Sequence, residues 1–279
     1  MTAPDPVASA PSAPIRLLAP DEPPAAAVER ADGASPLLLI ADHAGNRVPR
    51  ALGQLGLPPA ELLRHIAIDI GILGVCRELS ARLDATLIHQ RYSRLVIDCN
   101  RHPQHESAFL PSSDGTRVPG NERLAFDDAA RRIVEIFMPY HAAIGSWLDR
   151  RRELARPAAL IAMHSFTPHH SVLGGERPWP IAVLFNRDDA IPRRLIDLLR
   201  REAGLDVGVN EPYRVDDESD FSVVVHGEAR GVPSVEIEIR QDLIATPEDQ
   251  RRWGEMLAPL LRRAAFDVLG LSPTDPRTS

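Results

Sequence analysis

The sequence predicts an α/β fold, in which a central mixed, largely parallel β-sheet carries helices on both faces. The first sign is that short apolar runs of strand length alternate with longer stretches of helical periodicity. The second is that candidate metal ligands stand where two apolar runs end, and open α/β sheets bind ligands at the carboxyl ends of their strands. The 279 residues, 44% of them hydrophobic, suffice for one substantial core.

The individual elements follow from hydrophobic periodicity. The expected strands are Pro36 to Ala41, Ala85 to His89, Arg94 to Asp98, Ala158 to Met163, Ile181 to Phe185 and Ser234 to Arg240. The expected helices are Ile70 to Leu83, Glu122 to Arg152, Ala190 to Glu202 and Glu248 to Leu269. Residues Pro103 to Asn121, rich in Pro, Ser, Gly and Asp, predict a long loop of the type that often covers an active site.

The pattern along the chain predicts one domain between two tails. Residues 1–35 are rich in Ala and Pro and lack periodicity, so we expect a flexible tail with at most a short edge segment around Ile15 to Leu18. Residues 36–270 form the expected single catalytic domain, and residues 271–279 a C-terminal tail.

Composition points to a soluble enzyme with a small-molecule substrate. The formal net charge of −7 argues against binding to nucleic acid or to an anionic membrane, and no apolar run approaches the ~18 residues that span a bilayer. The N-terminus lacks the pattern of a secretory signal, so we expect a cytoplasmic protein. All 32 basic side chains are arginine, which excludes lysine chemistry but suits the binding of carboxylates.

Two histidines follow buried runs and predict a metal site. His43 comes after the run that ends at Ala41, and His164 ends the run that begins at Ala158. A catalytic zinc uses about three protein ligands and keeps one position open. Either histidine alone could be an ordinary hydrogen-bonded residue, but together they favour a metal. The expected third ligand is Asp69, whose alternative role is to cap the following helix.

The run from Ser234 to Arg240 alternates strictly, so Glu236, Glu238 and Arg240 share one face of a strand. On an exposed edge these side chains would be unremarkable. In a central strand a carboxylate must be paired or used, and a glutamate beside an activated water can act as general base. We expect Glu238 to be the catalytic base, with Glu236 or His226 as the alternatives.

An Asn–Arg pair follows the expected strand Arg94 to Asp98. Asn100 and Arg101 can hold a substrate carboxylate through an amide donor and a charge-assisted fork. Arg94 and Arg240 are also expected to bind substrate, although Arg94 could instead pair with Asp98. The sequence leaves open which arginine stabilises the transition state.

Several ordered motifs resemble those of the N-formylglutamate amidohydrolase family. They are HAGNRVP at 43–49, DIG at 69–71, RLVIDCNR at 94–101, PYH at 139–141, HSF at 164–166 and IEIRQDL at 237–243. The resemblance runs from about Pro36 to Leu269 and implies a zinc exopeptidase or phosphorylase/hydrolase-like fold. It also implies a divalent metal, expected to be zinc, and hydrolysis of N-formyl-L-glutamate to formate and L-glutamate. Zinc exopeptidases carry glutamate where this chain has Asn46, so the carboxylate ligand must come from elsewhere, for which we infer Asp69.

The same resemblance leaves the substrate open within a class of small N-acyl amino acids. One alternative is a carboxypeptidase-like enzyme or a deacylase that acts on another N-acyl amino acid. A second alternative is a small-ligand-binding protein that keeps the scaffold without catalysis. The oligomeric state is also left open.

Overall fold

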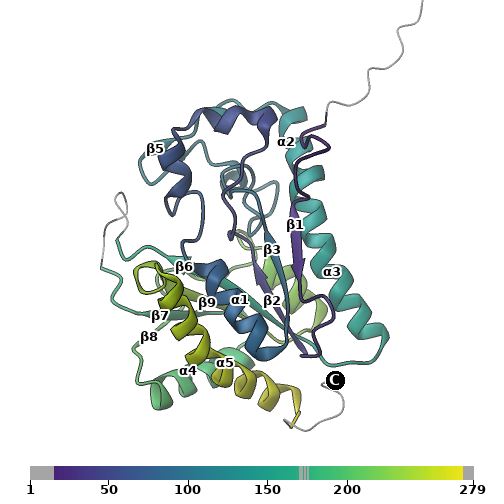
Figure 1. Cartoon of the computed structure of the whole chain (residues 1–279), viewed down its shortest axis with the longest axis vertical. Helices are drawn as coiled ribbons and strands as arrows, with labels where there is room; N and C mark the ends of the chain where they lie inside the picture. Colours follow the sequence, from purple (N-terminus) through teal and green to yellow (C-terminus); the bar gives the residue numbers. More distant parts are fainter. Residues whose placement is uncertain (1–15, 170–171, 173, 175, 273–279) are drawn as a thin grey trace, which may run out of the picture.

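A mixed β-sheet with helices on both faces organises the residues that the computed structural model describes, namely 16–169, 172, 174 and 176–272 (Figure 1). Across the sheet of the described residues, the strands lie in the order β1 (Ala26–Glu29), β3 (Thr86–Gln90), β2 (Leu37–Ala41), β6 (Ala159–Phe166), β9 (Ser234–Arg240), β7 (Ile181–Leu184) and β8 (Val207–Val209). Strands β3, β2, β6 and β9 are parallel to one another, whereas β1 and the β7–β8 pair run the other way. The predicted mixed, largely parallel sheet is therefore confirmed.

Helices cover the two faces of this sheet unequally. The α-helices are α1 (Ile72–Leu83), α2 (Phe126–Arg132), α3 (Met138–Glu153), α4 (Ala190–Glu202) and α5 (Pro247–Leu269). Helices α1, α4 and α5 pack on one face, and α3 lies along the other beside β1 and β3 (Figure 1). A π-helical segment, Ile133–Phe137, joins α2 to α3.

Alternation along each strand divides the apolar residues between two cores. In β2, Leu37 and Leu39 pack with α1, α4 and α5, whereas Leu38 and Ile40 pack with α3. Successive side chains of a strand point to opposite faces, so the register of each strand decides which residues can meet on the α3 side.

Strand β9 shows what this alternation does to charged residues. Its apolar members Val235, Ile237 and Ile239 belong to the core under α1, α4 and α5. Glu236 and Glu238 therefore point to the other face, and they are only 4% and 6% exposed because β9 lies inside the sheet between β6 and β7. The exposed-edge interpretation of these glutamates is wrong.

The predicted strand Arg94 to Asp98 is wrong, since residues 94–96 form a turn and residues 97–98 have no regular secondary structure. The Ser93 hydroxyl accepts a hydrogen bond from the backbone N–H of Leu95 at 3.1 Å, and the N–H of Val96 donates to the Ser93 carbonyl at 2.9 Å. The apolar residues of the run are buried in the core on the α3 side. Burial without a neighbouring strand explains why the composition resembled that of a strand.

The predicted boundary of the N-terminal tail also needs correction. Residues 26–29 form β1, which pairs antiparallel with β3 at the edge of the sheet. Leu17 is 4% exposed, and the backbone N–H groups of Leu17 and Leu18 donate to the Glu135 carboxylate at 2.7 and 3.0 Å. Residues 16–18 are not a strand, and Ile15 lies outside the described residues. A strand can pair at a sheet edge without hydrophobic periodicity, so the sequence pattern did not indicate β1.

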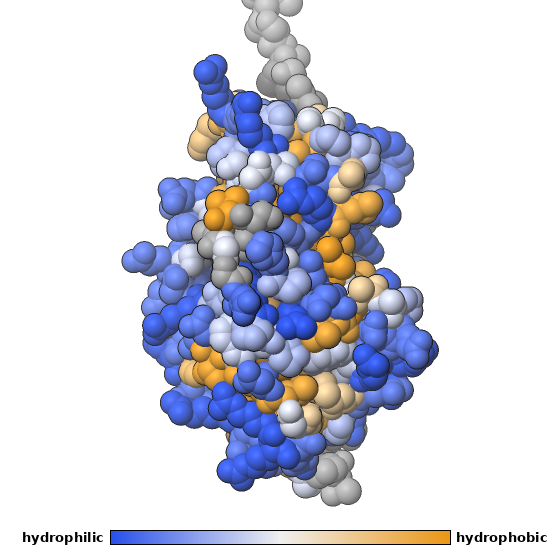
Figure 2. Space-filling view, turned by 90° about the vertical axis from the view of Figure 1, so that its left-hand side faces the viewer, coloured by the Kyte–Doolittle hydropathy of each residue, from blue (hydrophilic) through white to orange (hydrophobic). Residues whose placement is uncertain are grey.

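The long connection from Pro103 to Asn121 folds into a short hairpin of β4 (Ser112–Ser113) and β5 (Thr116–Arg117) with 3-10 turns on either side. Figure 2 shows that one face of the molecule is mostly hydrophilic, with apolar side chains in narrow bands. Among the described residues, no helix has the length and apolar character that crossing a bilayer requires.

Candidate metal centre and active site

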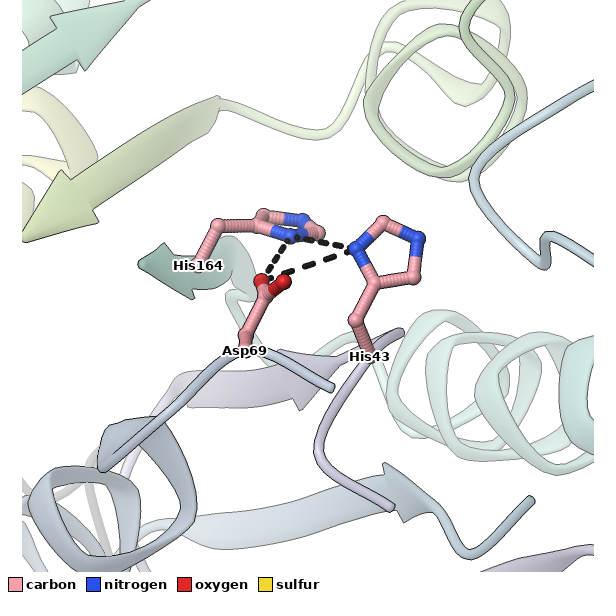
Figure 3. A group of neighbouring side chains, drawn as sticks. All are labelled: His43, Asp69 and His164. Carbon is pink, nitrogen blue, oxygen red and sulfur yellow. Dashed lines mark hydrogen bonds and ion pairs between the residues drawn. The ribbon is translucent and has the colours of Figure 1, made fainter. Parts of the chain in front are cut away.

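Three potential ligand atoms, one each from His43, Asp69 and His164, converge at one point (Figure 3). Nδ1 of His164 lies 3.1 Å from Nδ1 of His43 and 3.0 Å from Oδ2 of Asp69, and the remaining side of the triangle is 3.5 Å. Ligands bound tetrahedrally to zinc at ~2.0–2.1 Å lie ~3.3 Å from one another. The three side chains therefore fit a zinc-sized ion.

Two glycines let the loops that carry these ligands approach their neighbours. A Cβ at Gly45 would lie 2.1 Å from the Arg91 carbonyl oxygen, and one at Gly71 would lie 2.1 Å from that of Ile244. Gly71 also has a φ of +81° and occupies the N-cap position of α1. The capping role considered for Asp69 is thus wrong, and its carboxylate instead accepts the N–H of Ser165 at 3.2 Å.

Carboxylates behind the two histidines orient their rings. Nε2 of His43 lies 2.7 Å from Oδ1 of Asp98, and Nε2 of His164 lies 3.2 Å from Oδ2 of Asp42. Asp42 is fully buried and also accepts the Ser222 hydroxyl at 2.5 Å. Since each Nε2 faces a carboxylate, each Nδ1 is left to point into the triangle, as in carboxylate–histidine–metal arrangements.

The buried carboxylates around His43, Asp69 and His164 favour a positive charge at this triangle. Burial alone would lower the pKa of His164, but Glu236, Asp42 and Asp69 together raise it well above its ordinary value. Burial alone would raise the pKa of Asp42, yet His164 and its other neighbours lower it to about 2. The carboxylates thus stabilise a cation at the triangle, as they would stabilise a metal ion.

Both glutamates of β9 lie beside the triangle. Glu238 is the direct partner of His164 in the parallel β6–β9 ladder, and Oε2 of Glu236 lies 4.0 Å from Nε2 of His164. Burial raises the pKa of Glu236 to about 7 and that of Glu238 to about 8. Glu236 lies 3.4 Å from the Asn100 amide, whereas Oε2 of Glu238 is buried without a hydrogen-bond partner among the described residues.

The triangle opens into a cavity of about 180 Å³, smaller than the ~300–1,000 Å³ typical of sites for drug-sized ligands. A small amino acid derivative suits this volume. The expected substrate-binding residues Arg94, Asn100 and Arg101 line the cavity, together with Tyr213 and Arg214.

Comparison with known proteins identifies the family of this chain. Residues 35–245 match the model of a family described as N-formylglutamate amidohydrolase. The chain belongs to the N-formylglutamate amidohydrolase family. An N-formylglutamate deformylase of Pseudomonas putida is 30% identical over 147 residues, which are 49% of this chain and 54% of the relative. The chain thus spans about half the length of this curated relative.

Two solved structures share the fold of this amidohydrolase-family chain. A gene product of Agrobacterium tumefaciens is 33% identical and has a TM-score of 0.86 over 91% of this chain and 99% of its own. An N-formylglutamate amidohydrolase from Ralstonia eutropha is 20% identical, with a TM-score of 0.59 over 88% of this chain and 98% of its own.

Three residues considered for the site lie elsewhere in this family member. Arg240 does not line the cavity, because its guanidinium bonds to Asp242 at 2.9 Å and to the Pro178 carbonyl at 3.0 Å. The Asn46 amide donates to the Leu62 carbonyl at 3.0 Å. His226 is buried away from the cavity. Its Nε2 lies 3.0 Å from Nδ1 of His141, which is on α3.

The structure also adds to the candidate site residues that no sequence pattern indicated. Tyr213, Arg214 and Asp220 come from the connection between β8 and the π-helical segment Ser222–Gly227. Arg177 supports them, since its Nη1 donates to the Tyr213 hydroxyl at 2.9 Å. These residues have neither a strand-end position nor a periodic spacing, so only the tertiary fold brings them to the cavity.

Proposed function

We propose that this protein is a metal-dependent amidohydrolase that converts N-formyl-L-glutamate, or a closely related N-acyl amino acid, to the free amino acid and the carboxylic acid. The observation that carries the proposal is the convergence of His43, Asp69 and His164 beside Glu238, whose Oε2 has no hydrogen-bond partner among the described residues. The curated relative named as an N-formylglutamate deformylase supports this choice of substrate.

His43, Asp69 and His164 would hold the metal ion, for which we propose zinc because two imidazoles and one carboxylate form a usual catalytic zinc set. Such an ion, when bound, supplies Lewis acidity and makes a water molecule more acidic. Asp98 and Asp42 hold the histidine rings in the orientation that this role requires.

Glu238 acts as the general base in the proposed reaction. It takes a proton from the attacking water as the oxygen bonds to the formyl carbon. It then gives this proton to the amide nitrogen as the carbon–nitrogen bond breaks. Burial raises the pKa of Glu238, and positive charge at the triangle opposes that shift, so the group operates near neutrality.

The cavity arginines would hold the substrate. We propose that Asn100 and Arg101 bind a substrate carboxylate and that Arg94 stabilises the negative charge that develops on the carbonyl oxygen. Arg94 suits the latter role because Asp98 holds Nε and Nη2 at 3.1 and 2.6 Å, while Nη1 lies 3.6 Å from Oδ1 of Asp69. Arg240 is left out because it does not line the cavity.

The test combines metal analysis with a substrate series. Purified protein should contain close to one zinc per chain and release formate from N-formyl-L-glutamate, and a chelator should abolish this activity. N-acetyl-L-glutamate in the same assay tests the acyl group. His164→Ala should lose the metal and the activity while the circular dichroism spectrum persists, whereas the exposed-histidine control His102→Ala should keep both. Full metal content in His164→Ala would exclude His164 as a ligand.

A further inference from the structure

Of the described residues, three arginines line the active-site cavity, and two of them are already paired with carboxylates of the protein. Arg94 donates to Asp98 through Nε and Nη2 at 3.1 and 2.6 Å. Arg101 forms an ion pair with Asp220, which also lines the cavity. The protein therefore already balances part of the positive charge of these two arginines. The third arginine, Arg214, differs from them.

Arg214 is exposed at the cavity and forms no hydrogen bond or ion pair with any residue that the structure describes. Its neighbours on both sides are nevertheless fixed. The Tyr213 hydroxyl accepts a hydrogen bond from buried Arg177 at 2.9 Å, and the Arg177 guanidinium lies 5.0 Å from the centre of the Tyr213 ring. Val215 is buried against Leu184 of β7. A well-anchored backbone thus presents to the cavity a guanidinium that pairs with none of the described residues.

The remaining charges of the cavity explain why an unpaired cation matters. Its lining includes the carboxylates of Asp69, Asp220, Glu236 and Glu238. A substrate with two carboxylates of its own would meet this negative charge, and a cation beside its second carboxylate would offset the repulsion. A planar guanidinium that can donate two parallel hydrogen bonds suits a carboxylate.

We propose that Arg214 binds the side-chain carboxylate of the substrate and so gives this enzyme its preference for an acidic amino acid. The inference rests on the proposed function, which it makes more specific. The positions of Asn100 and Arg214 in the cavity indicate which substrate carboxylate each of them binds. The α-carboxylate sits on the carbon that bears the scissile nitrogen, so it must lie near the reaction centre. Asn100 lies near the reaction centre, because its amide nitrogen is 3.4 Å from Oε2 of Glu236 and this oxygen is 4.0 Å from Nε2 of His164.

Arg214 stands instead at the solvent-exposed side of the cavity, where the more distant carboxylate of a glutamate side chain would lie. Because Arg214 itself is exposed and only its neighbours are anchored, its replacement should leave the fold intact. The recognition of an acidic side chain is thereby separable from the chemistry at Glu238.

The test compares N-formyl-L-glutamate with N-formyl-L-glutamine, which differ only at the end of the side chain. In Arg214→Ala, KM for the acid should rise roughly 10- to 100-fold, the change expected when a charge-assisted hydrogen bond is lost. KM for the amide should change little. Arg214→Lys keeps the charge but loses the fork, so its KM for the acid should be intermediate. Arg251→Ala removes the same charge from an exposed position on α5 and should match the wild type.

Calorimetric binding of L-glutamate and L-glutamine to the same variants measures recognition without turnover. If wild-type protein deformylates both substrates and Arg214→Ala weakens both equally, the inference is wrong while the proposed function stands. If wild-type protein deformylates neither, but prefers L-glutamate over L-glutamine until Arg214 is replaced, the proposed function fails and the recognition role stands. A wild-type protein that does not distinguish acid from amide in either assay would overturn the inference.

Discussion

Nε2 of His43 lies 2.7 Å from Oδ1 of Asp98, and the same carboxylate binds Arg94 and the backbone N–H of Asn100. Burial alone would raise the pKa of Asp98, but Arg94 and His43 together lower it well below its ordinary value. One carboxylate therefore fixes both a proposed metal ligand and a cavity arginine.

Replacement of this carboxylate should weaken metal binding without removing a ligand. We expect Asp98→Asn to lower zinc affinity by about 10- to 100-fold, because the imidazole of His43 loses the charge that orients it and makes it more basic. Competition with a chromophoric chelator measures the affinity. Asp242→Asn is the matched control, because it makes the same replacement at an exposed aspartate that pairs with Arg240. Equal affinities in both variants would show that Asp98 has no influence on the metal.

Glu238→Gln tests the proposed base. The variant should keep its metal and its KM, and kcat should fall on the order of 10²- to 10⁴-fold because the amide cannot accept the water proton. Glu236→Gln is the comparison, since this neighbour on the same face lies within reach of the Asn100 amide. A larger loss in Glu236→Gln than in Glu238→Gln would reverse the two assignments.

The buried pair His141 and His226 should make the fold sensitive to mild acid. Burial lowers the pKa of His141 to about 4 and that of His226 to about 3. Because folding lowers both values, the stability they contribute is fully present above the unfolded value of ~6.5 and is lost as pH falls below it. For each histidine, the free energy of unfolding should fall by about 2 kcal/mol when the pH is lowered from 7.5 to 5.

Urea unfolding at these two pH values measures that loss, and a variant isolates it from the titration of other groups. The difference in stability between wild type and His226→Asn should change by about 2 kcal/mol over the interval. The exposed-histidine variant His102→Asn should follow the wild type. A constant difference between wild type and His226→Asn would contradict the prediction.

The hairpin of β4 and β5 is joined to two other segments at one side chain. Asp114 has a side chain 1% exposed and lies 3.4 Å from Arg64 and 3.2 Å from His65, and it accepts the N–H of Val172 at 3.1 Å. Ser113 of this hairpin and His65 line the cavity. Asp114 has a φ of +41°, which asparagine tolerates, so Asp114→Asn removes the charge without new strain.

We expect Asp114→Asn to increase the rate at which a protease cuts within residues 103–121, and substrate to slow that cutting in the wild type. Limited proteolysis followed by mass spectrometry locates the cuts. Equal rates with and without substrate in the wild type would count against a role of this loop as a lid.

Hydrophobic periodicity predicted those helices and strands that bury one face of apolar side chains in the core. Helix α4 spans Ala190–Glu202 as expected, because its apolar residues recur on one face that packs against the sheet. The irregular structure of residues 94–98, which begins with a turn at 94–96, and strand β1 were not predicted. The first is apolar because a core surrounds it, and the second forms through backbone pairing at a sheet edge, which leaves little trace in composition.

The same distinction applies to the site. His43, His164 and Glu238 could be singled out because each stands on or just after a strand, where alternation and direction constrain the side chain. Asp42 also follows a strand directly, but the tertiary fold decides that it lies behind His164, just as it decides that Asp98 lies behind His43. Arg214 lines the cavity only because its connection returns there. Contacts of this kind depend on tertiary structure and not on local pattern.

The pairing of His164 with Glu238 across β6 and β9 has a consequence for how such a protein can diversify. The spacing between these residues is set by main-chain hydrogen bonds inside the sheet, whereas Asp114 and Arg214 belong to connections between elements. Under the proposed roles of these two connections, changes within residues 103–121 and 210–220 would alter which substrate binds and leave the spacing of His164 and Glu238 unchanged. A library randomised only in those two connections is the natural starting point for redirecting it to other acylated amines.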